Sequence, residues 1–271
     1  MTTPRHVLVT GAASGIGHAV AARFAAAGDS VTGVDVRHDV LATAMDRLAG
    51  DHGVRTRAVV ADLALPDCAT VVERVRREGG DIDVLVNAAG IYPATPLERM
   101  TPESWSRVQD VNVRAPVLLT VALSALAAEA GRSPCVVNIS SGAATRARPG
   151  AAHYCTSKAA LEMATKACAV ELAGRGIRVN AVAPGFIEVD SPVNPVTADY
   201  AAQVSANPLG RAGAAEEIAA AVYWLAGDDA GFVTGSVLRV DGGATAGTTA
   251  LPPHYPEETD LQAAMPKRES A

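Results

Sequence analysis

Aromatic side chains are scarce in this chain, at 4% of its 271 residues. Because 49% of the residues are nevertheless hydrophobic, the core has to be packed mainly by valine, alanine and leucine. This composition argues against a disordered chain. The length suits one large α/β domain that can bury a sizeable core.

Cysteine is also sparse, and its four positions show neither a CxxC motif nor a Cys/His ligand spacing. We therefore expect no disulfide framework and no bound metal. Reduced, partly buried thiols are typical of a cytoplasmic protein. The four residues are Cys68, Cys135, Cys155 and Cys168.

The chain has no excess of positive charge. A net charge of −6 and a pI near 5.5 argue against nucleic acid or an anionic membrane surface as a partner. We expect no apolar run long enough to span a bilayer, and no signal-peptide pattern precedes the first strand-like segment. These absences predict a cytoplasmic protein that acts on a small molecule.

What the chain does contain is an alternation of short apolar runs with longer alanine-rich segments. This alternation predicts a doubly wound parallel sheet covered by helices on both faces. The predicted strands are His6–Thr10, Ser30–Asp35, Arg57–Val60, Val84–Asn87, Pro134–Ser140, Arg178–Val182 and Val237–Val240. The predicted helices are Ile16–Ala27, Val40–Asp51, Pro66–Glu78, Pro102–Ala130, Ala151–Ala173 and Ala215–Ala226.

Two segments interrupt the alternation. Residues 188–213 are proline-containing and lack a clear period, which predicts a long mobile loop of the kind that serves as a lid. Residues 244–271 are also rich in proline and predict either an irregular tail or a segment packed across a neighbouring subunit. Residues 1–243 would then form the folded domain.

Tyr154 and Lys158 lie four residues apart, so they share one face of a predicted helix. A free tyrosine has a pKa near ~10, too high for a base at neutral pH, and a nearby ammonium lowers it. The pair can therefore move an alcohol proton. A surface helix with a partly buried tyrosine remains the alternative unless the chain also binds a hydride carrier.

A glycine-rich turn follows the first predicted strand and contains Gly11, Ser14, Gly15, Ile16 and Gly17. Glycines let the backbone approach a pyrophosphate, and the N-terminus of the following helix presents oriented N–H groups. A tight turn that needs positive φ would explain the glycines equally well.

Further polar residues follow the next three predicted strands, at the sheet edge where open α/β folds bind their ligands. An isolated acid at such a place fits a helix cap or a solvated loop. Together with the glycine turn, these residues predict a dinucleotide site. They are Asp35, then Asp62 and Leu63, then Asn87, Ala88, Ala89 and Gly90.

Asp35 also bears on which dinucleotide is bound. A carboxylate there repels a 2′-phosphate and accepts hydrogen bonds from a free ribose hydroxyl, which favours NAD over NADP. Arg37 is the opposing signal, because an arginine two residues further on can reach a phosphate. Ser14 adds no cation to the glycine turn, so we predict NAD.

Taken together, the chain resembles the short-chain dehydrogenase/reductase family over residues 5–243. The resemblance implies a Rossmann-like domain with the strand order 3-2-1-4-5-6-7 and an NAD(H)-dependent interconversion of a secondary alcohol and a ketone. The matching motifs are Thr10-Gly11-x-x-x-Gly15-Ile16-Gly17, Asp62-Leu63, Asn87-Ala88-Ala89-Gly90, Asn112, Asn138-Ile139-Ser140-Ser141, Tyr154-x-x-x-Lys158, Pro184-Gly185 and Val240-Asp241-Gly242-Gly243.

The resemblance also implies roles for the residues. Tyr154 would exchange a proton with the substrate oxygen, and Lys158 would lower the pKa of Tyr154 and hold the nicotinamide ribose. Ser141, rather than Ser140, would hydrogen-bond the substrate oxygen. Asn112 would hold a proton-relaying water, since Pro116, four residues on, lacks the N–H that would occupy its carbonyl.

The nicotinamide end of the site is implied by the segment that follows the sixth strand. Pro184, Gly185 and Ile187 would border the nicotinamide there. Val189 stands where many relatives carry a threonine that bonds the cofactor. The nicotinamide would therefore be held more loosely, or by Ser191 instead.

The substrate side is less defined by the sequence. Tyr92, Pro93 and the connection from Ser141 to Tyr154 would line the pocket with the loop 188–213. Arg146 and Arg148 either contact an anionic substrate or are solvated loop arginines. His153 either contacts the substrate or is a surface or interface residue, and we interpret it as the latter.

Three classes of function remain open. The first is an oxidoreductase, NAD-linked or an NADP-linked ketoreductase. The second is a non-catalytic dinucleotide-binding regulator of the same fold. The third is a nucleotide-sugar epimerase or dehydratase, which normally needs a further substrate domain. Two long alanine-rich helices predict a homo-oligomer, either a dimer or a D₂ tetramer.

Overall fold

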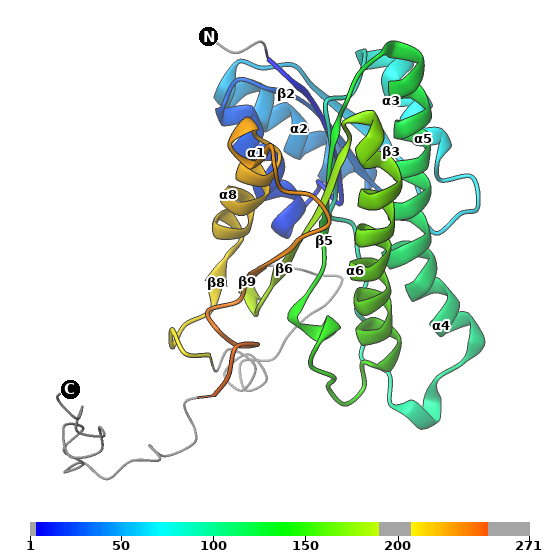
Figure 1. Ribbon diagram of the computed structural model, residues 1–271, viewed down its shortest axis with the longest axis vertical. Coiled ribbons are helices and arrows are strands. Elements are labelled where there is room, and N and C mark those ends of the chain that lie inside the picture. Colours follow the sequence, from blue (N-terminus) through cyan, green and yellow to red (C-terminus); the bar gives the residue numbers. More distant parts are fainter. Residues whose placement is uncertain (1–3, 190–206, 249–271) are drawn as a thin grey trace, which may run out of the picture.

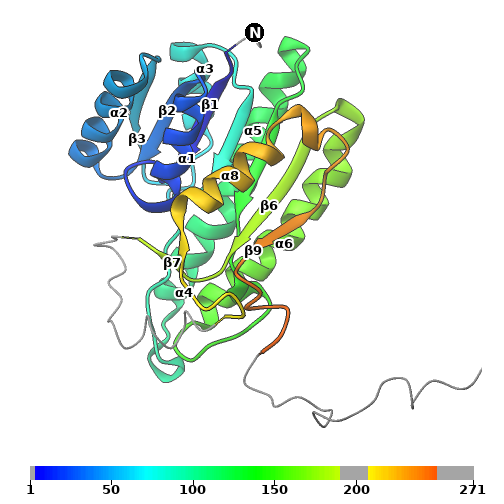
Figure 2. The ribbon, with the colours of Figure 1, turned by 90° about the vertical axis from the view of Figure 1, so that its left-hand side faces the viewer.

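Seven parallel strands form one twisted sheet at the centre of the protein (Figures 1 and 2). The computed structural model describes residues 4–189 and 207–248. The strand order is β3-β2-β1-β4-β5-β6-β9, so the predicted order is confirmed with β9 as its seventh strand. The strands are β1 His6–Thr10, β2 Ser30–Asp35, β3 Thr56–Val60, β4 Val84–Asn87, β5 Cys135–Ile139, β6 Arg178–Pro184 and β9 Val237–Val240.

Helices cover both faces of this sheet (Figures 1 and 2). One face carries α1 Gly15–Ala26, α2 His38–His52 and α8 Ala215–Leu225, and α1 packs along α8. The other face carries α3 Thr70–Gly79, α5 Ala115–Ala130 and α6 Ala152–Leu172, with α4 Pro102–Gln109 preceding α5. The predicted Rossmann-like architecture is therefore confirmed.

Each face of the sheet has its own apolar core. Phe24, Met45 and Ile218 are fully buried against the sheet on the side of α1, α2 and α8. Leu85 and Leu119 are fully buried on the side of α3 and α5. Because burial of one such side chain contributes about 1.5–3 kcal/mol, these two layers hold the strand ends in place for the site.

Two helices differ from the prediction. The structure begins α3 at Thr70 rather than Pro66, because the chain before it forms turns in which Asp62 Oδ1 accepts the N–H of Ala64 at 2.9 Å. The predicted helix Pro102–Ala130 is divided by a π-helical segment, Asp110–Arg114, before α5. Proline at position 116 has no N–H for the α-helical bond to Asn112, which favours this local change.

The segment Pro102–Ala130 also corrects the expectation that no apolar run could span a bilayer. Among the described residues it is long and apolar enough by length and composition alone, with a mean hydropathy of 1.7 in one window. Half of that window is buried inside the protein, where α5 packs against α3 and α6. Its apolar residues thus form part of the core.

The carboxyl ends of the strands meet at one edge of the sheet, the lower edge in Figure 1. A small parallel pair stands there, β7 Ile187–Glu188 with β8 Gly213–Ala214, at the base of the predicted lid loop. The predicted nicotinamide ligand Ser191 and most of the predicted tail lie outside the described residues.

Candidate functional site

The glycine turn between β1 and α1 is built so tightly that side chains cannot fit. A Cβ on Gly17 would lie 2.2 Å from the carbonyl oxygen of Gly11, and a Cβ on Gly11 would lie 2.9 Å from the backbone of Ala89. Gly11 and Gly15 also have positive φ, at 68° and 56°. The backbone of this turn is therefore free to approach a ligand at the N-terminus of α1.

A threonine that the sequence analysis left without a role ties this turn to the next strand. Thr10 Oγ1 accepts hydrogen bonds from the N–H groups of Ala88 and Ala89, both at 3.0 Å. The strand register explains the contact, since Thr10 pairs with Asn87 across β1 and β4. The two predicted cofactor segments are thus brought together, and a polar residue ending β1 was the available signal.

Asp35, Arg37 and Ser14 form one cluster at the end of β2. The Arg37 guanidinium donates to Asp35 Oδ1 at 3.0 Å and to Ser14 Oγ at 2.8 Å. Asp35 is buried, and its Oδ2 also accepts the N–H of Ala13 at 3.3 Å. The carboxylate that favours NAD is therefore held in place by the same arginine that the sequence suggested as an opposing signal.

The Asn87–Gly90 segment reaches the other predicted groups. Asn87 donates to Asn138 Oδ1 at 2.8 Å, and Asn87 Oδ1 is buried with no partner among the described residues. A Cβ on Gly90 would lie 3.4 Å from Asn112 Oδ1 and 3.6 Å from Lys158 Nζ. Gly90 therefore lies directly beside Asn112 and Lys158.

The segments after β6 and β5 close the other side of this edge. A Cβ on Gly15 would lie 3.8 Å from Val189, and a Cβ on Gly142 would lie 3.7 Å from the Pro184 carbonyl oxygen. Gly185 packs against Asp241 backbone, where a Cβ would meet Cα at 2.8 Å. The predicted nicotinamide segment, which includes Ile187 in β7, thus borders both the glycine turn and the Ser141 loop.

Asp62 and Leu63 are placed differently. The Asp62 carboxylate caps its own turn and faces Arg107 at 3.5 Å, and Leu63 is buried in the core. These contacts place Asp62 in a turn and not at the N-cap of α3, which is Ala69. They leave the backbone of this segment as the part that can border the adenine end of a dinucleotide.

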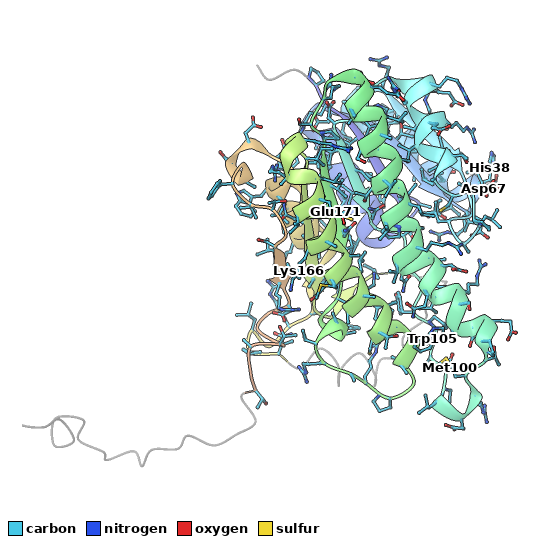
Figure 3. The ribbon with its side chains drawn as sticks, turned by 45° about the vertical axis from the view of Figure 1, so that its right-hand side comes forward. His38, Asp67, Met100, Trp105, Lys166 and Glu171 are labelled. Atoms are coloured by element: carbon cyan, nitrogen blue, oxygen red, sulfur yellow. The ribbon has the colours of Figure 1, made fainter. Side chains whose placement is uncertain are left out.

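Tyr154, Lys158 and Ser141 meet where β5 and α6 approach each other. Lys158 Nζ lies 5.8 Å from the centroid of the Tyr154 ring and donates to the carbonyl oxygen of Ile139 at 2.7 Å. Ser141 acts on the Tyr154 side chain closely enough to lower the pKa of the phenol, and its Oγ accepts the N–H of Ala143 at 3.1 Å. Lys158 is 5% exposed, whereas Lys166 and Glu171 lie on the outer side of α6 (Figure 3).

Burial dominates the acid–base behaviour of this group. It raises the pKa of the Tyr154 phenol, while the hydrogen bond from Ser141 and the charge of Arg148 lower it. Burial also lowers the pKa of Lys158 to about 8. The net direction for Tyr154 is opposite to the sequence expectation, because that expectation counted the ammonium and left out desolvation.

Asn112 is held by its side chain rather than left free. Its Oδ1 accepts the N–H of Ile91 at 2.9 Å, and its Nδ2 donates to the Ile91 carbonyl at 2.9 Å and to Ser157 Oγ at 3.0 Å. Ser157 was not predicted and links Asn112 to α6. Only the backbone carbonyl of Asn112 is therefore suited to hold the predicted water.

His153 is fully buried in the protein, which corrects its interpretation as a surface residue. Its Nδ1 accepts the N–H of Tyr154 at 2.9 Å, so its proton resides on Nε2. Burial lowers the pKa of His153, which keeps the imidazole neutral. Its imidazole is thus bonded to the backbone of the first turn of α6.

The remaining neighbours of Tyr154 come from the predicted substrate side. The Tyr92 ring lies 5.7 Å from the Tyr154 ring at 52°, and the Arg148 guanidinium carbon lies 5.6 Å from the same ring centroid. Arg146 instead is exposed and donates to the carbonyl oxygen of Ala244. The structure thus separates the two arginines that the sequence grouped together.

This arrangement fits a nicotinamide dinucleotide. The glycine turn is packed so closely that a Cβ on Gly11 or Gly17 would collide with backbone, Asp35 presents a fixed carboxylate, and Asn87 keeps a buried oxygen without a partner among the described residues. The chain belongs to the short-chain dehydrogenase/reductase family, and it is an oxidoreductase with an NAD(P) site. Residues 11–245 match the family profile described as Enoyl-(Acyl carrier protein) reductase.

Individual relatives span nearly the whole chain. It is 39% identical over 238 residues to the 3-oxoacyl-(acyl-carrier-protein) reductase FabG of Thermotoga maritima, covering 87% of this chain and 96% of that relative. A blue fluorescent protein from a metagenomic library in complex with NADPH has a TM-score of 0.80 and 36% identity, covering 88% of this chain and 97% of that chain. A 4-hydroxyisoleucine dehydrogenase complexed with NADH has a TM-score of 0.79 and 31% identity, covering 90% and 100%.

Proposed function

We propose that the protein interconverts a secondary alcohol and a ketone, with Tyr154 as the acid and base. The observation that carries this proposal is the convergence of Ser141, Tyr154 and Lys158 beside Gly90, at the edge where the glycine turn opens. The bound nicotinamide would supply or accept the hydride. Tyr154 would take the alcohol proton in oxidation and return it to the ketone oxygen in reduction.

The neighbours of Tyr154 prepare it for this exchange. Ser141 donates a hydrogen bond to the substrate oxygen and stabilises the charge that develops there. Lys158, held against the Ile139 carbonyl, has further N–H donors that can bind the nicotinamide ribose. The backbone carbonyl of Asn112 orients a water that relays the proton to Lys158.

The other proposed cofactor contacts follow the dinucleotide along the sheet edge. The glycine turn would bind the pyrophosphate, Asp35 the adenosine ribose, and the segments after β3, β4 and β6 the two bases and their riboses. The proposed residues are Gly11, Ser14, Gly15, Ile16, Gly17, Asp35, Asp62, Leu63, Asn87, Ala88, Gly90, Pro184, Gly185 and Ile187.

For the cofactor we propose NAD rather than NADP. Asp35 is buried and already accepts hydrogen bonds from Arg37 and from the N–H of Ala13, so a 2′-phosphate would meet a fixed negative charge. The reach of Arg37 to Ser14 favours the second candidate, an NADP-linked ketoreductase, because this guanidinium could turn to a phosphate. The relatives with bound cofactor include both an NADPH and an NADH complex.

Exchange of one residue decides between the two cofactors. If NAD is the cofactor, Arg37→Ala leaves kcat/KM for NADP⁺ within about twofold of wild type, and Asp35→Ser lowers the ratio of kcat/KM for NAD⁺ over NADP⁺ at least about tenfold. If NADP is the cofactor, Arg37→Ala lowers kcat/KM for NADP⁺ at least about tenfold.

A reduction screen tests the activity itself. Wild-type protein and Tyr154→Phe are incubated with NAD⁺ or NADP⁺ and a panel of secondary alcohols, and with the reduced cofactors and the matching ketones. Turnover that disappears in the variant supports the proposal. Tight NAD binding without turnover on any alcohol or ketone would favour the dinucleotide-binding regulator.

We also propose that the protein is a cytoplasmic homo-oligomer, a dimer or a D₂ tetramer. Its four cysteines are free, which suits a reducing compartment. The outer sides of α5 and α6 expose Val121, Met163 and Val170 at 55%, 64% and 81%, a surface that a second copy would cover. Light scattering on the purified chain measures the number of subunits.

We propose residues 1–243 as the catalytic domain, with residues 244–271 as a separate tail.

A further inference from the structure

We infer that Arg148 binds a carboxylate of the substrate, and that the natural substrate is therefore a hydroxy acid or the corresponding keto acid. This inference rests on the proposed alcohol–ketone chemistry and names the substrate class for the same site. Its basis is the position of the Arg148 guanidinium relative to the Tyr154 ring.

The guanidinium carbon of Arg148 lies 5.6 Å from the centroid of the Tyr154 ring. Arg148 stands in the connection between β5 and α6, six residues before Tyr154, and is partly buried. Its charge opposes, without overcoming, the rise in the pKa of the Tyr154 phenol that burial causes. The cation is therefore held over the ring of the residue that exchanges the proton.

Two cations flank the same tyrosine. Lys158 Nζ lies 5.8 Å from the ring centroid, and Arg148 lies at a similar distance. The chain as a whole carries a net charge of −6. A positive site on a negative protein attracts an anionic substrate and raises its local concentration.

Lys158 and Arg148 have different surroundings, and we therefore infer different roles for them. Lys158 is 5% exposed and donates to the Ile139 carbonyl, behind the tyrosine. Arg148 stands in the connection between β5 and α6, and the Tyr92 ring, also predicted to line the substrate pocket, packs against the same tyrosine at 5.7 Å. A planar guanidinium can bind a carboxylate through two parallel hydrogen bonds, which also orients the substrate.

The short distance restricts the substrate further. Because Arg148 lies over the ring of the tyrosine that takes the alcohol proton, the proposed carboxylate is close to the carbinol carbon, as in a 2- or 3-hydroxy acid. In the reaction, the carbinol C–H bond breaks with two electrons transferred as hydride to NAD(P)⁺. The O–H bond breaks with its proton transferred to Tyr154, and the carbon–oxygen double bond of the keto acid forms.

Inhibition by a matched pair of small molecules tests this inference. Butyrate and butyramide have nearly the same shape, and they differ in charge. With a neutral alcohol such as 2-butanol as the varied substrate, we expect butyrate to compete with an inhibition constant at least about tenfold lower than that of butyramide. Arg148→Gln should remove this preference, and Arg148→Lys should retain part of it.

Arg146→Gln is the matched control, because Arg146 is exposed and its guanidinium is turned to the Ala244 carbonyl. This variant should leave the preference for butyrate unchanged. Equal inhibition by butyrate and butyramide in the wild type would overturn the inference. So would an Arg148→Gln variant, folded by circular dichroism, that weakens both inhibitors equally.

Calorimetric titration of butyrate into the NAD-loaded protein separates this inference from the proposed function. Binding of butyrate that depends on Arg148 is expected whether or not an alcohol has been found that the enzyme oxidises. Absence of turnover with Arg148-dependent binding contradicts the proposed activity alone. Turnover of neutral alcohols without such binding contradicts the substrate class alone.

Discussion

The glycine turn and the Ser141–Lys158 end of the site are built by different means. The turn is closed by backbone atoms, with a Cβ on Gly17 excluded at 2.2 Å from Gly11. The other end is held by side chains, with Lys158 bonded to Ile139 and Asn112 bonded to Ile91. The first is set by steric exclusion, and the second by burial and hydrogen bonds.

This difference separates binding from chemistry. A backbone cradle binds any phosphate-bearing cofactor that approaches it, and it has no group to titrate. The side-chain end keeps an ammonium in a buried place, where burial lowers its pKa to about 8. Substitutions at the two ends should consequently change different quantities.

A large effect is expected from Lys158→Met at the side-chain end. Loss of the ammonium should lower turnover by about a thousandfold and stabilise the protein at pH 7. The folded pKa of about 8 lies below the ordinary value of 10.5, so below pH 8 the wild type bears the cost of burying a charge. That cost is about 3 kcal/mol, and loss of the bond to Ile139 offsets about 1 kcal/mol of it.

The direction in which wild-type stability changes with pH follows from the same two pKa values of Lys158. Between pH 8 and 10.5 the unfolded chain binds more protons than the folded one, so wild-type stability rises with pH. The unfolding free energy that Lys158→Met gains over wild type, measured by urea unfolding, should therefore shrink as the pH rises from 8 to 10.5. Lys166→Met, on the exposed side of α6, is the control (Figure 3). A stability difference that does not change with pH would contradict the buried charge.

Gly17→Ala disturbs the backbone end instead. Its new Cβ would overlap the Gly11 carbonyl oxygen, and the forced shift should cost about 3 kcal/mol of unfolding free energy. Cofactor affinity, measured by titration calorimetry, should fall by about a hundredfold as the turn opens. Gly50→Ala in α2 is the control, because its Cβ would meet open space and should stabilise the helix by about 0.5–1 kcal/mol. Equal changes in unfolding free energy and cofactor affinity in Gly17→Ala and Gly50→Ala would refute the steric explanation.

Asn112→Ala should have the smallest effect on the chemistry. Loss of the hydrogen bonds to Ile91 and Ser157 should cost about 2–3 kcal/mol of stability. Turnover should fall by about tenfold through misplacement of the Asn112 carbonyl, with nearly unchanged NAD affinity. Ser157→Ala, which removes one of these bonds, provides the comparison. Unchanged turnover in Asn112→Ala would exclude the water relay.

The sequence predicted the sheet well, because strands buried on both faces are continuous apolar runs. β1, β2, β4 and β9 begin and end where they were expected. The glycine turn was also predictable, since positive φ and close packing both demand glycine.

The parts that escaped prediction depend on tertiary contacts. The burial of His153 and the raised pKa of Tyr154 both arise from packing in the folded protein. The bond from Arg37 to Ser14 joins residues 23 apart. Spacing along the chain placed Tyr154 beside Lys158, but it contained no information on how deeply the pair would be buried.

Removal of a single hydroxyl group tests the central claim, that Tyr154 transfers the substrate proton. Tyr154→Phe keeps the ring that packs against Tyr92 and Arg148 and removes the hydroxyl. We expect alcohol oxidation to fall by about a thousandfold or more, with the dissociation constant for NAD within about twofold of wild type. Turnover within tenfold of wild type in the folded variant would contradict the account.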